Sequence, residues 1–189
     1  MVTDASRKRT GFLFRYALRS FAIVLLLAIL IRVFFFSSYV MSGAAMLPSV
    51  WPGDFIVAVK WRLQQPKRGE IVAFQCPAAT ERICLKRVIA VEGDRVEYSE
   101  GKLMVNGRFS NNRPLSGVIA QESIEGQAWA IWPAPMQAVS TEPVIVPPRH
   151  VYVLNDKRVD NEDSRQWGAV PVELIEGRAM AGLAIPGLV

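Results

Sequence analysis

Ile83-Cys84-Leu85-Lys86-Arg87-Val88-Ile89-Ala90 is a run of apolar and β-branched residues interrupted by two cations, and it predicts a β-strand. One face of such a strand should be buried. Most lysines lie on exposed faces, so in the simplest interpretation Lys86 is a surface residue. On the buried face, desolvation would lower the pKa of its ammonium group and leave an amine that accepts a proton. The strand alone leaves both interpretations open.

Short strands are predicted on both sides of this run. The pattern places them at residues 54–59, 70–74, 95–98, 102–105 and 150–154. Residues 110–148 are weakly patterned and hold six of the 12 prolines, which predicts an insertion with irregular strands. Short strands at regular intervals favour a mainly β fold, a compact and partly open β-barrel or folded sheet.

An apolar segment near the N-terminus, from Ser20 to Val40, has 21 residues and one charge, Arg32. A helix of about 20 mostly apolar residues crosses the hydrocarbon core of a bilayer, so residues 20–40 are predicted to be a transmembrane anchor. A cleaved secretory signal has a similar composition. Cleavage at the small residues Ser42-Gly43-Ala44 would destroy a motif that continues through them, which favours a retained anchor.

The positive charge of the chain is concentrated before this anchor. The net charge is +5, and five basic residues precede the apolar segment: Arg7, Lys8, Arg9, Arg15 and Arg19. The remainder is close to neutral and has no basic stripe interleaved with aromatic residues, which disfavours a nucleic-acid partner. The positive-inside rule places residues 1–19 in the cytoplasm and the domain of residues 41–189 outside it, with the lipid bilayer as a partner.

Two further motifs lie far from Lys86 in the sequence. The first is Ser42-Gly43-Ala44-Ala45-Met46-Leu47-Pro48-Ser49, followed by Gly53-Asp54, and the second is Asp163-Ser164-Arg165-Gln166-Trp167-Gly168. Between them stands Leu85-Lys86-Arg87-Val88-Ile89-Ala90, followed by Gly93-Asp94. Together and in this order, the three motifs resemble the type I signal peptidases, membrane-bound serine–lysine proteases that remove signal peptides from exported proteins. The resemblance runs from about Arg32 to Gly182.

The resemblance implies that Lys86 is the general base of a Ser–Lys pair, in which a neutral lysine amine activates a serine hydroxyl. The family has its nucleophilic serine directly before the Met, where this chain has Ala45. A methyl group has no proton to lose, so the chain as written should be inactive. An introduced Ser-to-Ala change and a natural pseudoenzyme both account for Ala45. We favour the introduced change, because Lys86 and the third motif are intact.

The resemblance also assigns supporting and binding roles. Residues implied to support the oxyanion and the lysine are Ser42, Asn161, Asp163, Ser164 and Arg165. Asn161 stands where the family often has a serine that hydrogen-bonds the lysine amine, a bond that an amide can also make. The backbone N–H of residue 45 would be the second oxyanion donor. Residues implied to line shallow substrate pockets are Met46, Leu47 and Pro48. Upstream, Asn155-Asp156-Lys157-Arg158 departs from the family's usual Gly-Asp-Asn-Arg.

The chain has two cysteines, Cys76 and Cys84, which are too few for a structural zinc site. They flank the loop between the strand at 70–74 and the one that carries Lys86. Outside the cytoplasm a disulfide between them is expected, and two buried thiols are the alternative. The resemblance implies neither a metal nor a cofactor.

The function that the resemblance implies is a single-pass endopeptidase of the bacterial cytoplasmic membrane, with its catalytic domain on the periplasmic side. It would cut preproteins after small-x-small sites such as Ala-x-Ala, and the signal peptide would pair with an exposed strand edge. Two alternatives stay open. One is a specialised processing peptidase of the same clan, serving conjugation or pilus assembly. The other, if Ala45 is natural, is a non-catalytic protein that binds signal peptides.

Overall fold

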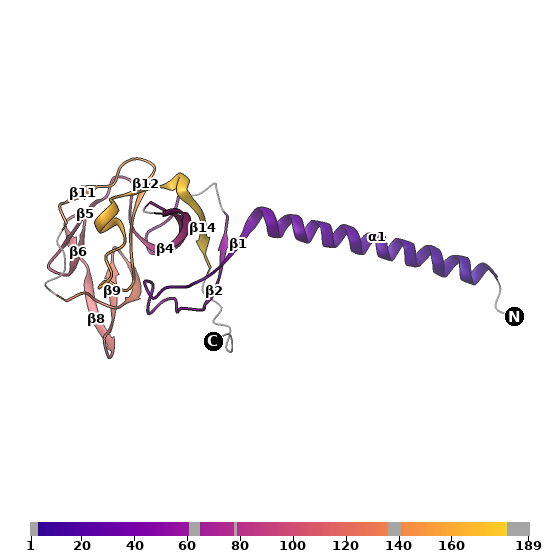
Figure 1. Cartoon of the computed structure of the whole chain (residues 1–189), viewed down its shortest axis with the longest axis horizontal. Coiled ribbons are helices and arrows are strands. Elements are labelled where there is room, and N and C mark those ends of the chain that lie inside the picture. The colour runs from indigo at the N-terminus through magenta and orange to yellow at the C-terminus, as the bar shows by residue number, and fades with distance from the viewer. Residues whose placement is uncertain (1–3, 61–64, 78, 136–140, 181–189) are drawn as a thin grey trace. The chain divides into compact units, whose positions relative to one another are not determined.

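The computed structural model describes residues 4–60, 65–77, 79–135 and 141–180, and the chain divides into two units, residues 1–36 and 37–189. The first unit is helix α1 (Asp4–Phe35; Figure 1). Its segment Phe14–Phe35, with a mean hydropathy of 2.4, is long and apolar enough to cross a bilayer. None of this segment is buried inside protein, as suits a helix that contacts lipid.

The helix ends before the expected anchor boundary. Residues 20–40 were expected to be helical, whereas the helix stops at Phe35 and Phe36–Val40 forms strand β1 at one end of a sheet. Tyr39 in this strand donates a hydrogen bond from its hydroxyl to Glu176, at 2.7 Å. Pairing in the sheet and this distant contact determine the conformation of the segment, and its apolar composition does not reveal either of them.

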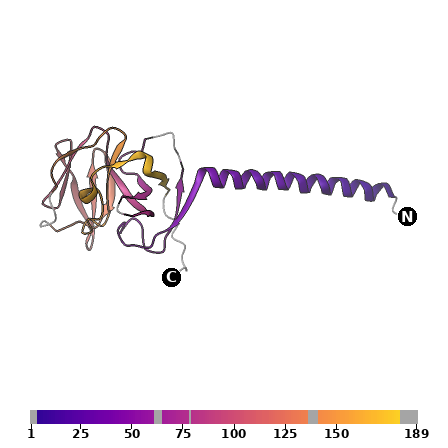
Figure 2. The same cartoon turned by 45° about the horizontal axis from the view of Figure 1, so that its top comes forward.

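The second unit is mainly β, as predicted (Figures 1 and 2). Its largest sheet has seven strands in the order β1-β2-β14-β3-β4-β12-β13. The strands after β1 are β2 (Phe55–Val59), β3 (Ile71–Cys76), β4 (Ala79–Val91), β12 (His150–Leu154), β13 (Val170–Pro171) and β14 (Ile175–Ala179). A short helix α2 (Ser164–Trp167) and a 3-10 helix η1 (Val172–Leu174) lie between β12 and β14. Within the described residues the sheets do not close into a barrel.

Two smaller antiparallel sheets occupy the middle of the sequence. One has the order β11-β5-β6-β7 and contains β5 (Arg95–Ser99), β6 (Lys102–Val105), β7 (Arg108–Phe109) and β11 (Val144–Ile145). The other has the order β10-β9-β8 and contains β8 (Asn111–Ser116), β9 (Ile119–Ile124) and β10 (Gln127–Ile131). We call this second one the inserted sheet.

The inserted sheet is more regular than the expected insertion of residues 110–148. Strand β9 alternates half-buried and buried residues, with Ala120, Glu122 and Ile124 facing inward. This two-residue period is typical of a strand with one buried face, although a glutamate on that face hid the pattern in the sequence. Residues 136–140 of the insertion and residues 181–189 of the expected catalytic domain lie outside the described residues.

Strand β4 lies between β3 and β12 and contributes to each of the three apolar clusters that form the core. Ile89 belongs to the cluster that also contains the β5–β6 hairpin and the inserted sheet. Val88 belongs to a second cluster with β3 and β12. Leu85 belongs to a third, with Met46. A strand packed on both faces leaves little water around its polar side chains, and this is the strand that carries Lys86.

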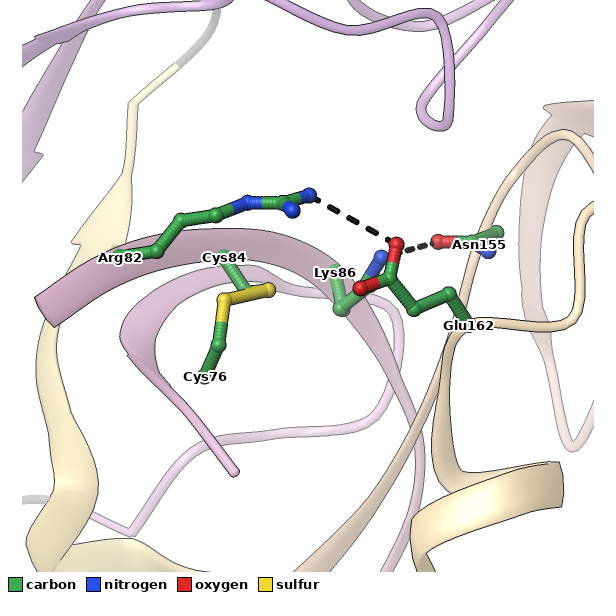
Figure 3. The surroundings of a disulfide bond; sticks show 6 residues. All are labelled: Cys76, Arg82, Cys84, Lys86, Asn155 and Glu162. Carbon is green, nitrogen blue, oxygen red and sulfur yellow. Dashed lines mark hydrogen bonds and ion pairs between the residues drawn. A yellow bond between two sulfur atoms is a disulfide. The ribbon is translucent and has the colours of Figure 1, made fainter. Parts of the chain in front are cut away.

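The β3–β4 hairpin is closed by a disulfide between Cys76 and Cys84 (Figure 3), with the two Cα atoms 5.3 Å apart. Cys76 ends β3, and Cys84 lies in β4 opposite Phe74, two positions before Lys86. The cross-link therefore restrains the beginning of the strand that holds the lysine.

We predict that the unreduced, detergent-solubilised chain takes up no alkylating reagent at cysteine, because both thiols are consumed in the Cys76–Cys84 disulfide. The measurement is the intact mass after alkylation in denaturant, with and without prior reduction. Reduction should add two alkyl groups. Two modified cysteines without reduction would rule out the disulfide.

Candidate active site

Lys86 is buried in the middle of β4, opposite Val72 of β3, with 3% of its surface exposed. Its amine donates a hydrogen bond of 2.6 Å to Oδ1 of Asn155, as Figure 3 shows. The Trp167 ring lies on another side, with its centroid 5.6 Å from the amine. Of the two interpretations that the sequence left open, the structure shows the buried amine.

The surroundings of Lys86 lower its pKa below the ordinary value of lysine. Burial is the largest cause, because desolvation disfavours the charged ammonium group. The carboxylates of Asp163, Glu162 and Asp160 act in the opposite direction, and Arg82 acts with burial. Arg82 and Glu162 form an exposed ion pair of 3.6 Å beside the lysine (Figure 3). The outcome is an amine that loses its proton more readily than a lysine in water.

Asn155 is held in place by the segment that follows β12, residues 155–165, which we call the catalytic turn. Asp163 accepts hydrogen bonds from the backbone N–H of Asn155 (3.0 Å) and from the backbone N–H of Arg165 (3.0 Å), where it caps α2. The guanidinium of Arg165 pairs with the same carboxylate at 2.7 Å. The Ser164 hydroxyl accepts from the backbone N–H of Val153, at 3.0 Å.

Arg87, the neighbour of Lys86, joins β4 to this turn and to the segment after residue 45. Its guanidinium makes two bonds to the Asp156 carboxylate, at 2.7 and 2.6 Å, and this carboxylate is fully buried. It also donates to the hydroxyl of Ser49 (3.0 Å) and to the backbone carbonyl of Gly69 (2.6 Å). Bidentate pairing of this kind fixes orientation as well as distance.

The segment around Ala45 is attached to the catalytic turn through its backbone. The carbonyl of Ala45 accepts a hydrogen bond of 3.0 Å from the N–H of Lys157. The next side chain, Met46, is 0% exposed and packs in the cluster that contains Leu85. Three sequence regions, around residues 45, 86 and 155–165, are thus joined by direct contacts.

Some of the predicted site residues lie elsewhere than the resemblance implied. The amide that accepts from Lys86 is Asn155, whereas Asn161 is exposed. The sequence does contain a signal for Asn155: the family's usual Gly-Asp-Asn-Arg has a glycine at this position, and this chain replaces it with a side chain that can accept a hydrogen bond. Met46 is fully buried and offers no surface to a substrate, while Leu47 and Pro48 are half-buried. Ser42 is exposed, and its proposed contact with an oxyanion stays a prediction.

Asp163, Ser164 and Arg165 do lie together behind Asn155, as the third motif indicated. Arg87 and Asp156 were not singled out in the sequence, although Arg87 belongs to the motif of Lys86 and Asp156 to the segment upstream of the third motif. Glu122 of the inserted sheet also reaches the turn, where it accepts from Arg158, and Trp129 of the same sheet donates to Glu122; nothing in the local sequence predicts this. Within the described residues, no group of three or more His, Cys, Asp or Glu side chains is arranged to hold a metal ion.

Comparison with known proteins identifies related sequences. Residues 14–183 match the family described as signal peptidase, peptidase S26. The chain is 30% identical to signal peptidase I of Bacillus caldolyticus, over 78% of this chain and 79% of that protein. It is 32% identical to a probable signal peptidase I-2 of Synechocystis, over 82% of this chain and 66% of that protein.

Other relatives are longer. The chain is 29% identical to a probable thylakoidal processing peptidase 2 of Arabidopsis thaliana, over 73% of this chain, and spans only 35% of that protein. The crystal structure of a signal peptidase I from Enterococcus faecalis is 27% identical, with a TM-score of 0.40 over 60% of this chain and 96% of that one.

We predict that replacing Lys86 by Met changes how the free energy of unfolding depends on pH. Because the pKa of Lys86 is lowered in the folded chain, the unfolded chain binds more protons between that pKa and the ordinary value of 10.5. In this window the stability of the parent chain rises with pH through this group. Lys86→Met should lack this rise. Its unfolding free energy relative to that of the parent chain should therefore be greatest at lower pH and fall as the pH increases.

The measurement is denaturant unfolding of both detergent-solubilised proteins at a series of pH values from neutral to alkaline. A difference in unfolding free energy between the two proteins that stays constant across the series would contradict a lowered pKa.

Proposed function

The chain belongs to the signal peptidase family, peptidase S26, and from this premise we propose that residues 45, 86 and 155–165 form a site for the signal peptides of exported preproteins. The site has the layout of a serine–lysine endopeptidase, with position 45 for the nucleophile and Lys86 as the base. The single observation that carries the proposal is the buried Lys86 amine, 3% exposed and hydrogen-bonded to Asn155 at 2.6 Å. An amine held in this way is suited to accept a proton at a pH where most lysines are charged.

With a serine at position 45, the proposed reaction has two stages. The Lys86 amine takes the hydroxyl proton while the serine oxygen bonds to the scissile carbonyl carbon. The ammonium then gives its proton to the departing amine, the peptide bond breaks, and an acyl-enzyme remains. In the second stage water attacks the ester carbonyl and gives a proton to Lys86; the ester bond then breaks, Lys86 returns the proton to the serine oxygen, and the acyl product leaves as the carboxylic acid. Charge on the carbonyl oxygen would be stabilised by the N–H of residue 45 and by the Ser42 hydroxyl.

In the chain as it stands, Ala45 stops this reaction before its first step, because its methyl group supplies neither a nucleophile nor a proton. Binding does not require the missing hydroxyl. The backbone N–H of residue 45 would still be available to an oxyanion, and its carbonyl accepts a hydrogen bond from the N–H of Lys157. We therefore propose that this chain binds signal peptides and does not cleave them. We also propose that Lys86 and the catalytic turn are positioned to act with a serine, if one is placed at position 45.

The proposed substrate is an extended segment that adds to the edge of β4. Strand β12 pairs with β4 only from Arg87 to Val91, and β3 pairs with the opposite edge of β4 from residue 79 onward. Within the described residues, no strand pairs with the β12-side edge of β4 before Arg87, which leaves room for main-chain pairing by a peptide. The half-buried Leu47 and Pro48 would face small side chains, such as alanine, before the scissile bond.

The proposed location is the bacterial cytoplasmic membrane, with the second unit on the extracytoplasmic side. Helix α1 supplies a candidate span at Phe14–Phe35, and basic residues cluster at its N-terminal end. The Cys76–Cys84 disulfide fits an oxidising compartment such as the periplasm.

The second candidate is a protein whose natural role is non-catalytic and that never had a serine at position 45, and Ala45 is the observation that favours it. A protein that holds signal peptides without cutting them would need the peptide-binding edge of β4 but not the lowered pKa of Lys86. The two candidates therefore differ in what a restored serine does.

We predict that Ala45→Ser converts the chain into a peptidase that cuts a preprotein once, after its Ala-x-Ala site. The parent chain and the double variant Ala45→Ser, Lys86→Met should show no cleavage. Losing one member of a nucleophile–base pair costs about a thousandfold or more in rate, because neither member acts alone. The measurement is the new N-terminus of the product, read by mass spectrometry with detergent-solubilised enzyme.

The matched control is Lys157→Met in the Ala45→Ser background, which removes a nearby lysine side chain and leaves its backbone N–H bond to residue 45 in place. It should retain activity. A folded Ala45→Ser protein that binds the preprotein without cutting it would favour the non-catalytic candidate. Equal cleavage with and without Lys86 would exclude this lysine as the base.

A further inference from the structure

Glu122 of the inserted sheet and Arg158 of the catalytic turn form a buried ion pair, each with 1% of its surface exposed. Both terminal nitrogens of Arg158 donate to the Glu122 carboxylate, one of them at 3.1 Å. The same carboxylate accepts from the Trp129 indole at 3.1 Å and from the Ser110 hydroxyl at 3.3 Å. A charged pair removed so completely from water is costly unless its geometry is good and its remaining polar atoms are hydrogen-bonded, as those of the Glu122 carboxylate are here.

The backbone of Arg158 leads from this ion pair to Lys86. Its carbonyl accepts a hydrogen bond of 2.8 Å from the guanidinium of Arg165, which also holds Asp163. Asp163 in turn binds the backbone N–H of Asn155, and Asn155 accepts from Lys86. Every bond in this series lies within or at the edge of the buried part of the molecule. A shift of Arg158 would therefore be expected to reach Asn155, the acceptor of the Lys86 amine.

A second series leads from the inserted sheet to residue 45. Trp132, which directly follows β10, accepts from the N–H of Arg158 at 2.8 Å and donates its own N–H to the carbonyl of Asp156 at 2.9 Å. Lys157, between these two residues, donates to the carbonyl of Ala45. The catalytic turn is therefore paired with the end of β10 at the point where it contacts the nucleophile position.

Trp129 contacts one member of each of two ion pairs made by the turn, Glu122 and Arg87. Its indole donates to Glu122, while its ring faces the Arg87 guanidinium, 5.5 Å from the ring centroid. Asp156 and Arg158, the neighbours of Lys157 in the sequence, are paired with Arg87 and Glu122. Both of these partners contact Trp129.

We propose that Glu122 is a positioning residue for the active site: by fixing Arg158 it holds the catalytic turn where Asn155 meets Lys86 and where Lys157 meets residue 45. The inserted sheet is then part of the active-site scaffold. The mechanistic meaning of this inference rests on the proposed function. Arg158 has no other carboxylate in bonding reach in the described structure, and its Nε is already buried without a partner. If Glu122 is lost, no other carboxylate of the described structure can take its place beside the Arg158 guanidinium.

The first test measures peptidase activity in the Ala45→Ser background. Glu122→Gln keeps the shape of the side chain and removes its charge. It should lower kcat about tenfold or more with little change in KM, because a small displacement of catalytic groups acts mainly on the chemical step. The acid limb of the pH profile should move to higher pH, since a displaced Asn155 admits water to Lys86 and raises the pKa of its amine toward the ordinary value.

A second variant separates positioning from stability. Replacing both Glu122 and Arg158 by Met removes the ion pair without leaving a buried unpaired charge, and such exchanges are often neutral for folding. We expect this protein to fold and still to show the lowered kcat and the shifted profile. The matched control is Asp94→Asn, which breaks the Arg68–Asp94 ion pair, 2.7 Å long and outside the catalytic turn. The pH profile of Asp94→Asn should be unchanged, even if this variant is less stable than the parent.

The second readout needs no activity and uses the chain with Ala45. NMR titration of isotope-labelled lysine side chains, with Lys86→Met to assign the signal, gives the pKa of Lys86 directly. This pKa should rise in the Glu122 variants and stay in place in Asp94→Asn. If Ala45→Ser is inactive but the pKa of Lys86 rises in the Glu122 variants, the proposed function fails and the positioning role stands. Folded Glu122 variants with an unshifted Lys86 titration would overturn the positioning role, even if Ala45→Ser is active.

Discussion

The hydrogen bond between the buried Lys86 amine and Asn155 is the interaction on which the rest of the site depends. A lysine packed inside a sheet must either lose its proton or find compensation for the water it has given up. Here the compensation is one amide oxygen at 2.6 Å and an aromatic ring on another side. The carboxylate of Asp163 accepts from the backbone N–H of Asn155 and makes no hydrogen bond to the lysine itself, and burial is the largest influence on the pKa of Lys86.

The catalytic turn carries an unusual concentration of buried polar groups, and nearly all of them are paired. Asp156 has Arg87, Arg158 has Glu122, and Asp163 has Arg165. Each pair joins the turn to a different part of the structure or stiffens the turn itself. In a medium of low polarity such pairs resist distortion, because breaking one leaves a charge without hydration. This explains how a segment with little regular secondary structure can hold the acceptor of a lysine amine in place.

Position 45 is the part of the candidate site whose side chain cannot take part in the proposed reaction. Lys86, the turn that orients it and the contact to the carbonyl of residue 45 are all present, while the side chain that would attack a substrate is a methyl group. The recorded contact of residue 45 with the turn is made by its backbone, so under the proposed function a methyl group at this position would remove the chemistry and leave the scaffold. A single oxygen atom would then separate a binding protein from a peptidase.

The sequence by itself determined the apolar helix, the mainly β domain and the hairpin of β3 and β4, because hydrophobic periodicity and turn residues are local signals. It also identified Lys86 and the third motif through their order along the chain. The tertiary structure decided which residues meet. That Asn155 and not Asn161 accepts from Lys86, that Met46 is buried in the core, and that Phe36–Val40 is a strand all depend on contacts between distant segments. Glu122 shows the reason most clearly: a glutamate in a polar-looking strand becomes a buried anchor only because folding brings Arg158 to it, and no local pattern encodes the position of a partner 36 residues away.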